Sequence, residues 1–182
     1  SQKELRLTPF QELVLVELKK VAKKIQYVEY KKIENLGHAE QLSDEMLRSM
    51  ALTHRKIYVV DLEDNVQGKT DSFNFILINR KYFVEYIKNN DYAKLYYLVL
   101  HEMAHGMESQ SHVHGEVFYS KFHESLIQFG NDFGSFEASL LDQVLVGRNF
   151  KTKKAFERYG ASKSNVEYFL RKHIKSVVAM VE

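Results

Sequence analysis

The sequence predicts a single domain of the α+β class, in which a long N-terminal helix precedes a small β-sheet and further helices follow. Three observations support this class: an amphipathic helical pattern after residue 8, two short segments rich in β-branched and aromatic residues, and a helical pattern that resumes after residue 91. The chain has 182 residues, 45% of them hydrophobic, which is enough to bury a sizeable core. We expect one domain over residues 1–182, with a core of about residues 55–130 on which helical N- and C-terminal extensions pack.

The first helix has a clear start signal. Thr8 is a typical N-cap residue, Pro9 suits the first helical position, and Gln11 completes a capping box. The apolar residues that follow repeat at spacings of four and three, which predicts one buried face and an end before Gly37; they are Val14, Leu18, Val21, Ile25 and Val28. A shorter helix is expected from Ser43 to Met50.

Two segments have the composition of β-strands. They cover residues 56–62 and 73–78, and both are rich in β-branched and aromatic side chains. The polar stretch between them, residues 63–72, contains Asp64, Asn65 and Gly68 and is predicted to be a loop. A small sheet should therefore stand between the first helix and the helices that follow.

The next helix contains the most informative motif, His101-Glu102-Met103-Ala104-His105. Asp91 can serve as its N-cap, and we expect the helix to continue to about Glu108. Positions i and i+4 lie on one face of a helix, so His101 and His105 can bind one metal ion while Glu102 projects beside it. The pattern predicts a metal site with an adjacent general base.

A third ligand has to come from beyond this helix, because a catalytic zinc site usually has three protein ligands and one open position. We predict His114 in preference to His112, because Gly115 allows close approach and a new amphipathic helix starts there. Glu137 is a further alternative, as a carboxylate on a later helix. The apolar stripe of the new helix is Val117, Phe118, Phe122, Leu126 and Phe129.

The motif His101–His105, a short connection and then His114-Gly115-Glu116-Val117-Phe118 resembles the signature of the SprT-like (Spartan) and WLM families of zinc metalloproteases. The resemblance covers roughly residues 73–129. It implies a zincin-like metallopeptidase fold, Zn²⁺ on His101, His105 and His114, and Glu102 as the catalytic base. The connection between His105 and His114 matches no single subfamily, so the subfamily and the third ligand stay open. The metzincin pattern is absent, because Glu108 and Ser111 replace its glycine and third histidine.

The expected function is therefore hydrolysis of peptide bonds in a protein or peptide substrate, with Glu102 assisting the attack of water. The alternative is a zinc-binding regulatory or protein-interaction domain with weak or no peptidase activity. The resemblance also implies that a sheet edge beside the metal holds the substrate as an added strand, and residues 73–78 are the candidate edge, although a plain core strand explains them equally well. Tyr119 is a candidate oxyanion donor without an assigned role.

The last third of the chain is predicted to contain a helix over residues 137–146 and a final helix capped by Ser162 or Ser164. Basic residues gather there, with aromatic residues between them, so this part of the chain could bind DNA, although a solvated basic surface is the commoner explanation of such a cluster. The net charge of the whole chain is only +2. The basic residues are Arg148, Lys151, Lys153, Lys154, Arg158, Lys163, Arg171, Lys172 and Lys175.

Cysteine is absent from the sequence, which excludes disulfides and thiolate ligands and fits a reducing compartment. The longest apolar run, residues 95–100, is too short to span a membrane, and no signal peptide is visible, so no membrane partner is expected. We expect an intracellular protein, cytoplasmic or nuclear, although a segment removed before Ser1 remains an alternative.

Overall fold

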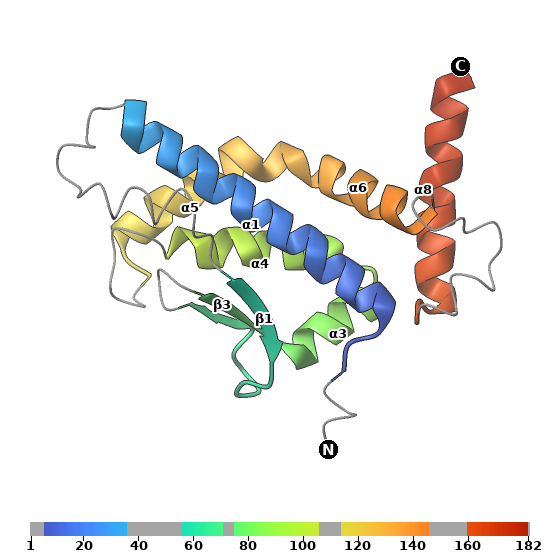
Figure 1. The fold of residues 1–182 in the computed structure, drawn as a ribbon, viewed down its shortest axis with the longest axis horizontal. Helices are drawn as coiled ribbons and strands as arrows, with labels where there is room; N and C mark the ends of the chain where they lie inside the picture. The colour runs from blue at the N-terminus through green and yellow to red at the C-terminus, as the bar shows by residue number, and fades with distance from the viewer. Residues whose placement is uncertain (1–5, 36–55, 71–74, 106–113, 146–159, 182) are drawn as a thin grey trace.

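The computed structural model describes residues 6–35, 56–70, 75–105, 114–145 and 160–181, and they form an α+β fold in which helices pack against a small sheet (Figure 1). The predicted fold class is confirmed at this level. The elements are α1 (Pro9–Asn35), β1 (Lys56–Val60), β2 (Gly68–Thr70), β3 (Phe75–Asn79), α3 (Arg80–Lys88), α4 (Tyr92–Ala104), α5 (Glu116–Phe129), a 3₁₀ turn (Gly130–Asp132), α6 (Phe133–Leu145) and α8 (Lys163–Val181).

Helix α1 begins with the predicted capping box. The backbone amide of Gln11 donates to Thr8 Oγ1 over 3.2 Å, and the backbone amide of Thr8 donates to Gln11 Oε1 over 2.9 Å. Gly160, just before α8, has a φ of +78°, and a Cβ there would lie 2.5 Å from Thr8 Cβ. Glycine is therefore required at the point where the chain entering α8 passes the start of α1.

The sheet differs from the expected one in its strand order. Its strands lie in the order β1-β3-β2, with β1 parallel and β2 antiparallel to β3. The prediction that residues 73–78 form the edge was wrong, because β3 is the central strand and its Ile76 and Ile78 are fully buried. The edge next to α4 is β2, which lies in the stretch predicted as a loop because three residues opening on glycine carry little strand signal.

Helix α3 was not predicted. Asn79 ends β3 and caps α3, because its side-chain oxygen accepts a hydrogen bond from the amide of Lys81 over 3.3 Å. The amide nitrogen of Asn79 also donates to the carbonyls of Glu63 and Val66, over 3.0 and 2.7 Å. This buried side chain fixes the loop that leads from β1 into β2, and so fixes the edge strand.

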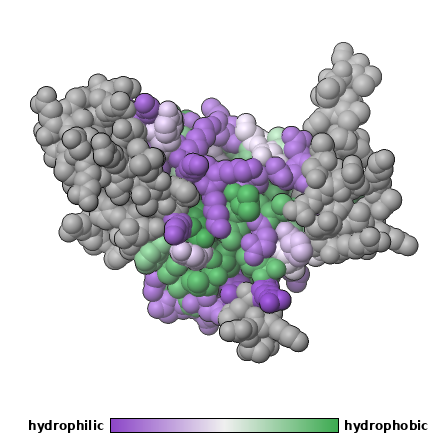
Figure 2. Space-filling model, in the orientation of Figure 1, coloured by the Kyte–Doolittle hydropathy of each residue, from purple (hydrophilic) through white to green (hydrophobic). Residues whose placement is uncertain are grey.

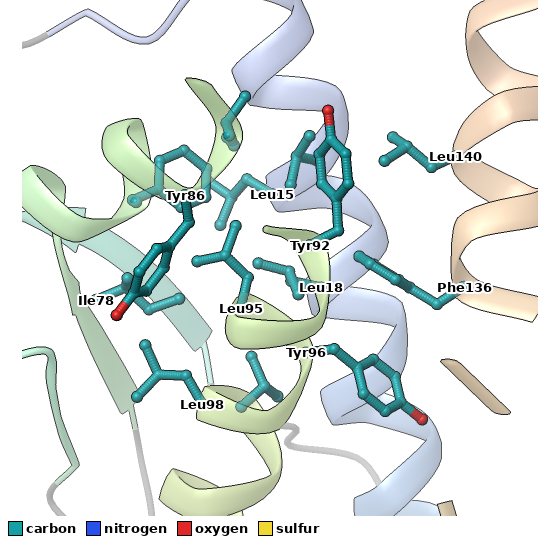
Figure 3. Packing of buried hydrophobic residues seen from close by; sticks show 14 of the residues in the cluster. Leu15, Leu18, Ile78, Tyr86, Tyr92, Leu95, Tyr96, Leu98, Phe136 and Leu140 are labelled. Atoms are coloured by element: carbon teal, nitrogen blue, oxygen red, sulfur yellow. The ribbon is translucent and has the colours of Figure 1, made fainter. Parts of the chain in front are cut away.

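Helix α4 lies at the centre of the core, with α1, α3, α5 and α6 against it and the sheet on one side (Figure 1). Figure 3 shows Leu95 meeting Leu18 of α1, while Tyr96 is directed toward Phe136 of α6. The rings of Tyr96 and Phe136 are 5.5 Å apart, and the Tyr96 hydroxyl donates to the carbonyl of Phe129. These contacts hold α4 rigidly, and so fix the position of the side chains in its last turn.

The C-terminal helices confirm part of the prediction. Helix α6 begins at Phe133, earlier than expected, and Ser162 caps α8 by accepting from the amide of Asn165 over 3.1 Å. The predicted helix at residues 43–50 lies outside the described residues. Among the described helices, none is long and apolar enough to cross a membrane.

Candidate metal centre

The last turn of α4 carries His101, Glu102 and His105. The helix ends at Ala104, with His105 in the capping position, so the motif lies at the helix end rather than well inside it, and the expected end near Glu108 was wrong. His101 is half-buried, whereas His105 and Glu102 are each only 5% exposed. The i and i+4 spacing places both histidine rings on one side, with centroids 5.2 Å apart.

His114 comes from just before α5 and joins these two histidines. Its ring centroid lies 5.1 Å from that of His101 and 4.9 Å from that of His105. The Nε2 atoms of His105 and His114 are 3.1 Å apart. One nitrogen from each of the three rings lies within 4.8 Å of the others, so the structure brings together all the predicted ligands.

Phe118 of α5 forms the floor under the three histidines. It is 2% exposed and stacks on His105, with ring centroids 4.2 Å apart and an interplanar angle of 24°. Its ring also lies 4.9 Å from His101 and 4.7 Å from His114. Sequence reasoning placed Phe118 only in an apolar stripe. His114 precedes α5, so no helical spacing links the two residues in the sequence.

The electrostatics of the site favour the neutral form of His101. Burial lowers the pKa of His101, and a charge on His114 lowers it further. A neutral imidazole has a free nitrogen lone pair, whereas a protonated imidazole has none to offer a metal. His101 is therefore in the ligand-competent form at neutral pH.

Glu102 lies against the sheet edge. A Cβ built on Gly68 of β2 would lie 3.2 Å from Glu102 Oε1, so the carboxylate and the edge strand are in close contact. Both line a groove of about 680 Å³ with the three histidines. The groove continues along β2 and β3 past Lys69, Thr70, Phe75 and Leu77.

The donor set fits a divalent transition metal. Tetrahedral coordination with metal–nitrogen bonds of about 2.0–2.1 Å places ligand nitrogens about 3.3 Å apart, close to the 3.1 Å between His105 and His114. Three imidazoles with no thiolate suit ions such as zinc, whereas magnesium and calcium prefer oxygen ligands. The cluster could thus hold a metal ion with a coordination position left over for water.

The alternative third ligand Glu137 lies away from the histidines. Glu137 is buried between α6 and α8, where its carboxylate accepts hydrogen bonds from Tyr168 Oη and Lys172 Nζ, and it is not part of the histidine cluster. His112 lies outside the described residues. Tyr119 is 59% exposed, and its ring centroid is 6.3 Å from that of His114, at the rim of the site.

Gly68 is the second site residue that sequence reasoning missed. It was assigned to a loop, and only the pairing of β2 with β3 brings it to Glu102.

No family model matches the chain, and no curated protein or solved structure matches it either.

Proposed function

We propose that this protein is a zinc-dependent metallopeptidase with a zincin-like fold, related to the SprT-like and WLM families that its motif resembles. One observation carries the proposal. The three histidines converge on one point at the end of α4, and the carboxylate of Glu102 lines the same groove, which is bordered by the edge strand β2. A metal-binding cluster with a buried carboxylate beside an open groove is the arrangement that metal-assisted hydrolysis of a peptide bond uses.

The chain's own residues divide the chemistry between them. When bound, zinc would lower the pKa of water and polarise the substrate carbonyl. Glu102 accepts the proton of the attacking water at its carboxylate and delivers it to the nitrogen of the leaving amine. Glu102 is only 5% exposed, so its carboxylate is shielded from bulk solvent. This shielding limits the exchange of its proton with bulk water during the reaction.

The sheet edge offers a way to hold the substrate. Within the described residues, strand β2 pairs with β3 alone, and β2 lines the groove that also contains His101, Glu102 and His105. An extended peptide that paired with this edge would gain main-chain hydrogen bonds without a sequence requirement. Phe75 and Leu77 also line the groove, which would favour apolar residues near the cleaved bond.

The decisive experiment compares the parent protein with Glu102→Gln and His105→Ala. We expect Glu102→Gln to retain zinc but lose proteolysis, because an amide keeps the shape of the side chain and cannot accept the proton. His105→Ala should lose zinc as well. Zinc is measured by elemental analysis and proteolysis by release of peptides from casein. A Glu102→Gln protein that cleaves casein at the parent rate would rule out Glu102 as the base.

The same experiment separates the alternative function. A parent protein that binds one zinc per chain and cleaves neither casein nor a peptide library would be a zinc-binding regulatory or interaction domain. The position of Glu102, which lines the groove beside the three histidines, favours an enzyme over a regulatory domain. A purely structural metal site needs no carboxylate beside it.

A second candidate function, action on nucleic-acid-associated proteins, is favoured by the outer face of α1. This face exposes lysines throughout its middle, together with Tyr27, which is 56% exposed. Figure 2 shows hydrophilic residues gathered over α1, beside a hydrophobic area over the sheet. Lysines with an exposed aromatic ring suit the backbone and bases of single-stranded nucleic acid. The exposed lysines are Lys19, Lys20, Lys23, Lys24 and Lys31.

The C-terminal basic region was the expected site of this contact. Residues 148 to 158 lie outside the described residues, and Lys163 and Arg171 are exposed. Lys172 is engaged with Glu137 and lies over the ring of Tyr168. On α1, Lys20 and Lys24 are likewise paired, with Glu17 and Asp132, and Lys31 lies over the ring of Tyr27. Lys19 and Lys23 are therefore the lysines on which the test is made.

A charge-reversal experiment tests the α1 face. Replacing Lys19 and Lys23 with Glu should weaken single-stranded DNA binding and lower the slope of log affinity against log salt by about 1.4, because each lost phosphate contact removes about 0.7. Lys81→Glu with Lys88→Glu on α3 makes the same change in net charge elsewhere. Filter binding over a salt series measures both. If the two double substitutions weaken DNA binding equally, the effect comes from the net charge of the protein and not from the α1 face.

A further inference from the structure

Gly68 is placed where the edge strand crosses the carboxylate of Glu102. A Cβ at this position would lie 3.2 Å from Glu102 Oε1 and 3.4 Å from its Cδ. It would also lie 3.1 Å from the carbonyl oxygen of Leu77, the neighbour across the sheet. The 3.4 Å to Cδ is an ordinary van der Waals contact, but the two contacts with oxygen are tighter than most that a Cβ makes in proteins. A methyl group would therefore fit only if one of these oxygens moved by a few tenths of an ångström.

Backbone conformation does not explain the glycine. Among the described glycines, only Gly160 has a positive φ, so Gly68 has a backbone that any residue can adopt. Glycine also weakens a strand, because it has no side chain to pack. What Gly68 contributes is the absence of a side chain at the place where backbone and carboxylate meet.

The two crowded neighbours differ in how they can respond. The Leu77 carbonyl belongs to the central strand β3, which pairs with strands on both sides, and so it is held in place. Glu102 is a side chain with rotatable bonds. A methyl group on Gly68 would therefore displace the carboxylate by a few tenths of an ångström more readily than the sheet.

We propose that Gly68 is the positioning residue of the active site: its missing side chain allows Glu102 to rest beneath the edge strand at the distance that proton transfer requires. The inference rests on the proposed peptidase function for its kinetic consequence. Its structural part, the steric coupling between position 68 and Glu102, stands apart from activity. General bases work within a narrow range of hydrogen-bond distance, so a small displacement slows the chemical step without weakening substrate binding.

The kinetic test is Gly68→Ala, with Gly130→Ala as the matched control, because a Cβ on Gly130 meets nothing within 4 Å. We expect Gly68→Ala to lower kcat by about tenfold or more, with KM within about twofold and zinc content unchanged. Gly130→Ala should match the parent in all three. A rise in KM with an unchanged kcat would instead place Gly68 in substrate binding and overturn the proposal.

The second test needs no activity. Gly68→Ala is measured for thermal stability in the parent and in a Glu102→Ala background, each with zinc bound. We expect Gly68→Ala to lower the melting temperature by a few degrees in the parent and by clearly less when the Glu102 carboxylate has been removed. The remainder reflects the Leu77 carbonyl, which both backgrounds share.

The two tests separate the two ideas. A parent that cleaves no substrate defeats the peptidase proposal, while the stability cycle still decides whether position 68 and Glu102 are coupled. An identical loss of stability in both backgrounds would refute the coupling. Equal kcat values for Gly68→Ala and Gly130→Ala in an active enzyme would refute the positioning role.

Discussion

Phe118→Leu tests whether the aromatic floor holds the metal ligands in place. Leucine preserves an apolar, buried side chain but removes the flat ring that stacks on His105 at 4.2 Å and contacts His101 and His114. Ring pairs contribute about 0.5–1.5 kcal/mol each beyond simple burial. Losing about 1.4 kcal/mol of support for the bound arrangement corresponds to a tenfold weaker affinity, which lies within the 10–100-fold range found when groups that orient metal ligands are altered.

Competition with a chromogenic zinc chelator measures this affinity. Phe10→Leu is the matched control, because Phe10 is equally buried but its ring packs on Phe169, away from the histidines. Both changes should cost about 1–2 kcal/mol of folding stability, since each opens space in a packed core. Only Phe118→Leu should weaken zinc binding. If its zinc affinity stays within twofold of the parent, the three histidines hold their geometry without the ring and the reasoning fails.

Three further outcomes are expected. His114→Ala should abolish stoichiometric zinc binding, whereas Glu137→Gln should keep zinc and lower only the melting temperature; the reverse result would identify Glu137 as the third ligand. Burial, followed by the charge of Asp132, raises the pKa of Tyr96 to about 12. Its stabilising contribution is therefore full below about pH 10, the unfolded value, and is lost as the pH rises toward 12. Urea unfolding should show this decline, and Tyr96→Phe should flatten it. Asn79→Ala should cost about 2 kcal/mol, because it removes the side chain that caps α3 and that donates to the carbonyls of Glu63 and Val66; calorimetry showing no loss would mean that water replaces the amide.

The sequence predicted the elements with strong local signals. The capping box at Thr8 and the cap at Ser162 are made by side chains within three residues of each other, so no tertiary information was needed. The motif His101–His105 is likewise local. His114 was predicted as the third ligand from the turn that follows the motif, and the structure places it beside His101 and His105.

The parts that failed depend on pairing across the chain. Strand β2 exists because Lys69 and Thr70 pair with Leu77 and Ile76, and such a short segment has almost no propensity of its own. Helix α3 had a readable start at Asn79, but its aromatic and β-branched residues resemble a continuation of β3. Strand order is a tertiary property. The edge strand, and with it the contact of that strand with the carboxylate of Glu102, could therefore not be predicted from the sequence pattern alone.

The ligands sit at the end of one helix and just before the start of another, with residues 106–113 between them in the chain. A bound ion would act as a cross-link between α4 and α5, and its binding energy would be partly folding energy. At a free zinc concentration 100 times the dissociation constant, the linkage amounts to about 2.7 kcal/mol. The apparent stability of this protein should therefore rise and fall with the free zinc concentration around it. A chelator should weaken the attachment of α5 to the core, whether or not a substrate is present.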